Sequence, residues 1–195
     1  MGKPKQTLIL NGVPMLQRVL EVLRVSSVGR VIVVLGANAA EVKKRVKFAG
    51  EVVVVNPRFA EGMSSSLRYG VEHAGRESDA VMIVLGDQPF VRSATIDTLV
   101  RAYEYSGARI IIPTHKGARG NPVIFDRGII PKVALIRGDT GAKSVVQENE
   151  ADVLEVEVAD RGILVDIDTP SDLQIRRRRS RGQASRPLGR LFLAS

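Results

Sequence analysis

The sequence predicts an α/β domain of three layers, in which a mostly parallel, doubly wound, Rossmann-like sheet lies between helices. Short aliphatic runs alternate along the chain with helix-compatible stretches, and the runs are continuous, as in strands buried on both faces. Alternation of this kind builds a parallel sheet covered on both sides. The runs lie at residues 31–35, 52–55, 81–85 and 109–112.

Three of the connecting stretches show a clear helical signal. Between residues 13 and 25 a proline stands near the start, and Leu16, Val19, Leu20 and Leu23 line one helical face. Ser64 can cap a second helix that reaches about Ala74, and an amphipathic pattern runs from Ile96 to Tyr103. Residues 39–47 are charged and helix-compatible, whereas residues 122–158 mix short strands, loops and one helix.

Composition sets limits on the class of protein. The chain has 195 residues, of which 44% are hydrophobic and 26% charged, as in one ordinary globular domain. It has no cysteine, which excludes disulfides and thiolate metal sites. No apolar run approaches the roughly 20 residues of a membrane helix, and no signal segment opens the chain. We therefore expect a cytoplasmic protein without a membrane partner.

The net charge of +8 is concentrated at one end of the chain. Residues 176–195 contain seven arginines and no acid, which leaves a net charge of +1 on residues 1–175. The body is therefore not a basic protein, and a nucleic-acid partner is not expected. The sequence predicts one domain over residues 1–175 and a basic, disordered tail over 176–195, in preference to a nucleic-acid or membrane contact.

Two acidic motifs follow predicted strands. Gly86-Asp87-Gln88-Pro89 places a carboxylate at a strand's carboxyl end, where Asp87 could bind Mg²⁺, although the same tetrapeptide also makes an ordinary turn. Asp166 and Asp168 lie on one side of an extended segment before Thr169-Pro170. Helix capping explains Asp168 equally well, and two carboxylates from distant strands could share one cation.

Two further segments suit a nucleotide. The stretch 61–67 reads Glu-Gly-Met-Ser-Ser-Ser-Leu, and its hydroxyl and N–H groups could bind a base, ribose or phosphate, whereas capping explains one serine of the three. Lys3 and Lys5, beside Gly2 and Pro4, would suit a triphosphate, although a disordered terminus also explains them.

These features occur in an order that resembles one family. The matching pieces over residues 1–175 are Met1-Gly2-Lys3-Pro4-Lys5, Asn11-Gly12-Val13-Pro14-Met15-Leu16, Asn56 with residues 61–67 and Gly70, Gly86-Asp87-Gln88-Pro89, Gly120-Asn121-Pro122-Val123-Ile124-Phe125, Gly138-Asp139-Thr140-Gly141-Ala142, and Asp166-Ile167-Asp168-Thr169-Pro170 with Asp172-Leu173. Together they are similar to the molybdenum cofactor cytidylyltransferases, which have a MobA-like NTP transferase domain.

The resemblance implies a nucleotidyltransferase that moves CMP from CTP to the phosphate of molybdenum-loaded molybdopterin and releases pyrophosphate, with a molybdoenzyme as acceptor of the product. It implies Mg²⁺ on Asp87 and Asp168, with Asp166 as a supporting ligand. The residues it assigns to the nucleotide are Gly2, Lys5, Ser65, Ser66, Gly86 and Asp87, with Lys5 and Asp87 catalytic. Those assigned to the pterin side are Gly120, Asn121, Pro122 and Asp139.

Other functions remain open at this point. The related guanylyltransferases share the fold, the lysine and the acidic site but usually lack the Gly-Met-Ser-x-Ser-Leu stretch, which favours cytosine here. Transfer of another nucleotide to a phosphorylated small molecule, and a non-catalytic maturation protein that binds a nucleotide or cofactor, are the alternatives.

The chain departs from the family at its start. Members begin with a buried strand and a Leu-Ala-Ala-Gly loop that cradles the triphosphate, and this chain begins at the methionine that follows them. Loss of a central strand would leave backbone groups of its two neighbours unpaired, at about 1–3 kcal/mol for each buried group. We expect the true start to lie upstream. A sheet closed around the gap and a decayed copy are the alternatives.

Overall fold

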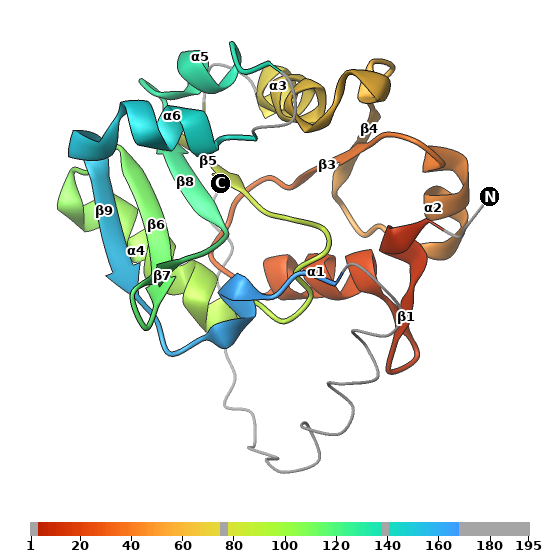
Figure 1. Ribbon diagram of the computed structural model, residues 1–195. Helices are drawn as coiled ribbons and strands as arrows, with labels where there is room; N and C mark the ends of the chain where they lie inside the picture. Colours follow the sequence, from red (N-terminus) through yellow and green to blue (C-terminus); the bar gives the residue numbers. More distant parts are fainter. Residues whose placement is uncertain (1–3, 75–77, 138–140, 168–195) are drawn as a thin grey trace.

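The structure, a computed structural model, describes residues 4–74, 78–137 and 141–167 (Figure 1). The predicted α/β fold is confirmed, because helices and strands alternate through the first two thirds of the chain. These elements are α1 (Met15–Arg24), β3 (Ile32–Leu35), α2 (Ala39–Arg45), β4 (Val52–Val55), α3 (Met63–Ala74), β5 (Ala80–Ile83), α4 (Ser93–Ser106) and β6 (Ile110–His115).

Shorter elements complete the fold. Short 3-10 turns are η1 (Lys5–Thr7), η2 (Phe59–Glu61), η3 (Glu150–Asp152) and η4 (Arg161–Leu164). The remaining strands and helices are β1 (Ile9–Leu10), β2 (Val13–Pro14), β7 (Ala118–Arg119), β8 (Val123–Asp126), α5 (Ile130–Val133), α6 (Lys143–Glu148) and β9 (Val153–Glu157).

The predicted helix at residues 13–25 begins two residues later than expected. Asn11 and Gly12 both have positive φ, 50° and 85°, which makes a tight hairpin turn. Val13 and Pro14 therefore pair with β1, and α1 starts at Met15. The proline precedes the helix instead of standing in its first turn.

The strands form one larger and one smaller main sheet. β3 and β4 pair in parallel, and the larger sheet has the order β5-β8-β6-β7 with β9 beside β6. β8 runs antiparallel to both β5 and β6, and β9 runs parallel to β6. β5, β6 and β9 therefore share one direction, with β8 and the two-residue strand β7 reversed.

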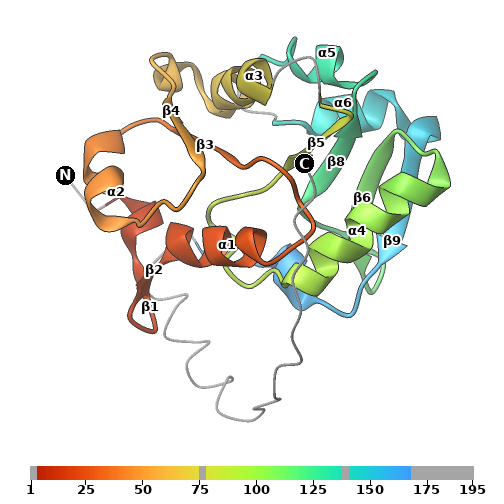
Figure 2. The ribbon, with the colours of Figure 1, turned by 180° about the vertical axis from the view of Figure 1, so that it is seen from behind.

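Helices cover both faces of these strands, which gives the three predicted layers (Figures 1 and 2). On one face, α1 packs against Val33 and Leu35 of β3, and Leu99 of α4 packs against Ile111 and Ile124. On the other face, α3, α5 and α6 cover a second cluster, which includes Ile110 and Ile112. Neighbouring residues of β6 thus point to opposite faces, as the pleat requires. No helix within the described ranges is long and apolar enough to cross a membrane.

A partly buried phenol gives the fold a titratable contact. Tyr103 of α4 donates its hydroxyl to Asp126 Oδ2 over 2.8 Å. Burial, with this hydrogen bond, raises the pKa of Tyr103 to about 12. A backbone N–H bond from Gly128 is the main cause that lowers the pKa of Asp126.

We expect this contact to stabilise the fold below about pH 10, where an unfolded tyrosine keeps its proton. Because the folded pKa is raised, the contribution is lost as pH rises toward about 12. Urea unfolding at pH 9 and pH 11.5 should therefore show a larger loss of stability in wild type than in Tyr103→Phe. Equal losses in the two proteins would contradict this.

Candidate active site

An ion pair lies where the first turn of the described chain meets the loop after β5. Lys5 Nζ is 2.8 Å from Asp87 Oδ2, and the two side chains are 30% and 32% exposed. η1 is fixed by Thr7, a buried residue whose hydroxyl and N–H groups both donate to Pro4 O. Two residues predicted for the nucleotide site, 82 positions apart, are therefore in contact at an accessible surface.

The loop of Asp87 is held close to the helix beneath it. A Cβ on Gly86 would contact Leu16 Cδ1 of α1 at 3.4 Å. Asp87 O in turn accepts a hydrogen bond from Ile167 N over 3.0 Å. The end of the described chain is thereby attached to the loop, and Asp166 is brought to the same edge of the sheet.

A buried glutamine joins the two acidic motifs. Gln88 is 4% exposed, and its Nε2 donates to Asp166 Oδ1 over 2.7 Å and to Ile163 O over 3.4 Å. Its Oε1 is buried and has no hydrogen-bond partner among the described residues. Gln88 therefore orients the Asp166 carboxylate, whose residue is otherwise exposed, relative to the loop that carries Asp87. The sequence analysis gave Gln88 no role, and only its position beside Asp87 could have indicated one.

The loop predicted for the pterin side, residues 120–122, contacts the backbone of Ile163. Asn121 N donates to Ile163 O over 3.1 Å, and the Asn121-Pro122 peptide is cis. A Cβ on Gly120 would lie 2.4 Å from Ile163 O, so only glycine permits this approach of two backbones. The loops at 86–88 and 120–122 thus converge on the carbonyl of Ile163.

Two serines predicted for the nucleotide site lie at the start of α3 and differ in exposure. Ser65 is 2% exposed, and its hydroxyl donates toward the carbonyls of Arg58 and Gly62 and accepts from Asn56 Nδ2. The Ser65 hydroxyl is therefore engaged in hydrogen bonds within the protein. Ser66 is half-buried and accepts a longer bond of 3.2 Å from Asn56.

Asn56 is a further residue for which the sequence analysis named no role. It directly follows β4, is fully buried, and also accepts a hydrogen bond from Arg58 N over 2.9 Å. Its position at a strand's carboxyl end, like that of Asp87, is the signal that could have found it. Asn56 fixes the turn that presents the start of α3.

Three predicted site residues, Gly2, Asp139 and Asp168, lie outside the described residues. Gly141, two residues after Asp139 in the sequence, lies beside α3, because a Cβ at this glycine would be 3.4 Å from Met63 Sδ.

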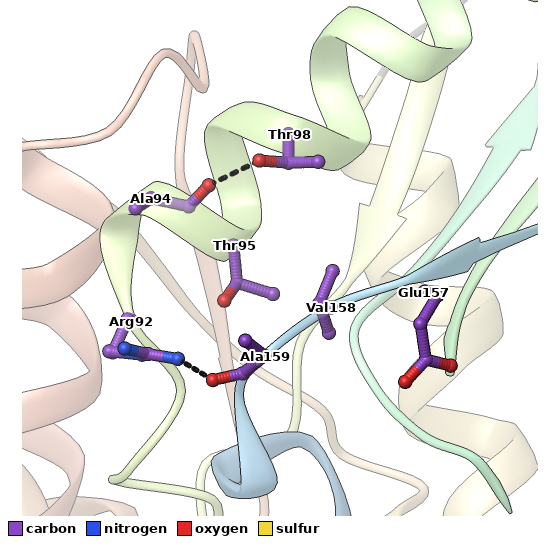
Figure 3. Close-up of a pocket in the computed structure, with 7 residues that line it drawn as sticks. All are labelled: Arg92, Ala94, Thr95, Thr98, Glu157, Val158 and Ala159. Atoms are coloured by element: carbon purple, nitrogen blue, oxygen red, sulfur yellow. Dashed lines mark hydrogen bonds between the residues drawn. The ribbon is translucent and has the colours of Figure 1, made fainter. Parts of the chain in front are cut away.

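A separate cavity of about 250 Å³ lies at the start of α4 (Figure 3). Arg92 lines it and donates to Ala159 O. Behind it, the buried Asp160 accepts bonds from Arg92 N, Thr95 Oγ1 and Gly162 N. These contacts attach α4 to η4 and therefore stabilise the fold. The cavity contains none of the predicted site residues.

A family model described as the MobA-like NTP transferase domain matches residues 1–153. The chain belongs to this family. It is accordingly a nucleotidyltransferase whose substrate is a nucleoside triphosphate, and the Lys5–Asp87 pair lies at the edge where doubly wound sheets bind ligands.

Known proteins agree with the family and differ in their named activities. A nicotine blue oxidoreductase from Paenarthrobacter nicotinovorans is 28% identical over 85% of this chain and 84% of its own. The molybdenum cofactor cytidylyltransferase of Escherichia coli is 24% identical over 73% of this chain and 71% of its own. The structure of Rv0371c from Mycobacterium tuberculosis, a complex with manganese, is 27% identical, with a TM-score of 0.77 over 89% of this chain and 91% of its own.

The side chains of this transferase suit a hard divalent cation. Asp87 and Asp166 offer carboxylate oxygens, and Mg²⁺ needs only one or two carboxylates when phosphate oxygens and waters complete its shell. Within residues 4–74, 78–137 and 141–167, no three His, Asp or Glu side chains gather into a metal site by themselves. A cation at these two carboxylates would need further oxygen ligands to complete its shell.

We expect Gln88→Leu to raise the Mg²⁺ concentration for half-maximal activity about tenfold, because Asp166 loses the bond that orients it. Thermal stability should change little, since the freed carboxylate is exposed. Gln17→Leu is the matched control, as Gln17 donates to Glu21 over 3.0 Å on the surface. An unchanged Mg²⁺ requirement in Gln88→Leu would contradict the assigned role.

Proposed function

We propose that this transferase is a cytoplasmic enzyme that moves CMP from CTP to the phosphate of a molybdopterin carrying molybdenum. The Lys5–Asp87 contact at the carboxyl edge of the sheet is the observation that carries the proposal, because it pairs a cation suited to phosphate with a carboxylate suited to a metal. The named activity of the E. coli relative supports the choice of acceptor.

In the proposed reaction a phosphate oxygen of the acceptor forms a bond to the α-phosphorus of CTP. The bond between the α-phosphorus and its bridging oxygen to the β-phosphorus breaks, and pyrophosphate leaves with that electron pair. No covalent intermediate with the protein is needed. Catalysis by the chain then consists of positioning the reactants and neutralising their charge.

The ion pair is well suited to a change of partners. With about a third of each side chain exposed, Lys5 and Asp87 can separate at little cost. The Lys5 ammonium would then meet the triphosphate, and the Asp87 carboxylate would be available to a divalent cation. We assign Mg²⁺ to Asp87 and Asp166, with Asp168 as a further ligand. When bound, Mg²⁺ neutralises phosphate charge that develops during transfer.

Specificity would come from the neighbouring loops. Ser66 is the hydroxyl we assign to the cytosine side, with Ser65 and Asn56 holding the turn behind it. Gly120, Asn121 and Pro122 are assigned to the pterin side, together with Asp139. Gly2 and Gly86 would bring backbone close to the phosphates. A molybdoenzyme that receives the finished cofactor is the expected protein partner.

The test is release of pyrophosphate from each of the four NTPs, with Mg²⁺ and molybdenum-loaded molybdopterin. We expect turnover with CTP that exceeds turnover with GTP, ATP and UTP, and that requires the acceptor. Turnover with GTP alone would indicate a guanylyltransferase. Absence of turnover with every nucleotide would refute the proposed activity.

A redox activity is the second candidate, because the oxidoreductase relative aligns over most of both chains. Its test uses the same purified protein with a reduced nicotinamide cofactor and a quinone-type dye, and follows cofactor oxidation. Redox turnover that persists in Asp87→Asn, without release of pyrophosphate, would favour this candidate over nucleotidyl transfer.

A further inference from the structure

We propose that Arg68 of α3 binds a phosphate group, which displaces the carboxylate of Glu61. The Arg68 side chain is only 16% exposed. Among the described residues its guanidinium makes one hydrogen bond, from Nη2 to Glu61 Oε2 over 3.0 Å. Its Nε is buried and has no partner in that part of the chain. An arginine carries five N–H donors, so this side chain has left water for very few acceptors.

A mostly buried cation in this state is unfavourable. Removal of a charged group from water costs on the order of several kcal/mol, unless an opposite charge and hydrogen bonds replace the lost solvation. Glu61 compensates weakly, because its side chain is 51% exposed and water screens the pair. An anion that accepts from more of the guanidinium would lower the cost further.

The contact with Glu61 uses half of one edge of the guanidinium. Nε–H and one Nη2–H point in parallel from the same edge of this planar group, an arrangement that fits two oxygens of one anion. Glu61 accepts from Nη2, and Nε is left over. A phosphate in place of Glu61 would accept from both atoms. Because Glu61 is half exposed, its side chain can turn to water at little cost.

The surrounding charges also favour an anion. Arg58 lies nearby, since its carbonyl accepts from Ser65 Oγ over 2.8 Å and Ser65 is three helical positions from Arg68. The Arg58 side chain is exposed and has no ion-pair partner among the described residues. Residues 56–68 contain two arginines and one glutamate, which gives the segment a net charge of +1. The first turn of α3 adds no acid.

The position of the segment indicates the class of anion. Asn56, directly after β4, donates to Ser66 Oγ over 3.2 Å at the start of α3. The segment therefore borders the edge of the sheet where doubly wound folds bind their ligands. Phosphate is the anion of a nucleoside triphosphate, and in the proposed function the acceptor carries it as well. The inference rests on the triphosphate substrate of the family and not on the choice of CTP or of molybdopterin.

NMR of the full chain labelled with ¹⁵N tests the inference, because a buried Nε–H exchanges slowly enough with water to be observed. Loss of one side-chain signal in Arg68→Gln assigns the resonance. We expect inorganic phosphate to shift the Arg68 Nε–H signal in a saturable titration. A signal that stays in place throughout the titration would overturn the proposal.

Two variants should change the affinity for phosphate in opposite directions, as measured from the backbone amide signals of residues 66–69. Arg68→Gln should weaken binding about tenfold, because a charge-assisted hydrogen bond is lost. Glu61→Gln should strengthen binding severalfold, since the competing carboxylate is removed. Arg101→Gln is the matched control, as exposed Arg101 donates to Thr98 Oγ1 over 3.3 Å on α4. A purely structural ion pair predicts no gain in Glu61→Gln, and that result would contradict the displacement.

Titration with CTP distinguishes the two sources of phosphate. If CTP shifts the Arg68 signal at lower concentrations than inorganic phosphate does, the site binds the triphosphate of the nucleotide. If inorganic phosphate still shifts the signal at saturating CTP, the site binds the phosphate of the acceptor. Both results support the site. Neither depends on turnover, so a failure of cytidylyl transfer would leave them unaffected.

Discussion

Asp87→Asn should lower the rate of pyrophosphate release about 10³-fold while the fold stays intact. The substitution keeps the size of the side chain and removes the charge that pairs with Lys5 and that we assign to the metal. Because the residue is about a third exposed, its amide can be solvated and little stability should be lost. Steady-state rates at saturating CTP and Mg²⁺ measure the effect, with thermal unfolding as the check on folding.

Asp79→Asn is the matched control for that result. Asp79 also forms a carboxylate ion pair, at 2.8 Å from Arg127, but it is 87% exposed and precedes β5 instead of following it. The control should keep wild-type activity. Equal activity of Asp87→Asn and wild type would exclude Asp87 from the reaction.

Gly162→Ala should destabilise the protein by about 3 kcal/mol. A Cβ at this position would lie 2.2 Å from Phe90 O and 2.4 Å from Phe90 C, so two backbone segments must move apart. The displaced segments carry Gln88 and Asp166, and activity should fall together with stability. Urea unfolding measures the loss.

Arg161→Ala is the matched control for Gly162→Ala, because it changes the neighbouring residue without adding a side chain at the glycine. Arg161 is exposed in η4, so its truncation should leave unfolding within about 0.5 kcal/mol of wild type. A Gly162→Ala protein with wild-type stability would show that the segment 161–167 is not packed tightly against the loop after β5.

The elements that the sequence predicted well are those with a strong local pattern. Leu16, Val19, Leu20 and Leu23 repeat at helical spacing, and all four are buried in one cluster against β3. The start of that helix was misplaced, because the Asn11-Gly12 turn pairs Val13 and Pro14 with a strand. Pairing between strands is a non-local contact that helical periodicity does not encode.

The candidate site was predictable where a residue type and a strand end coincide, as at Asp87. The hydrogen bonds that connect the residues of the site could not be predicted from the sequence. The bond from Gln88 to Asp166 joins residues 78 positions apart, and a glutamine carries no signal for such a partner. Ser65 is the opposite case, since its local sequence suits a ligand but Asn56 and two carbonyls use its hydroxyl.

The most direct measurement is a crystal structure of the full chain with Mn²⁺ and a non-hydrolysable CTP analogue, with Mn²⁺ located by anomalous scattering. The proposed site predicts a Mn²⁺ peak about 2.1 Å from an Asp87 carboxylate oxygen, with Lys5 Nζ turned from Asp87 to a phosphate oxygen. A nucleotide bound elsewhere, with the Lys5–Asp87 pair intact, would contradict the site.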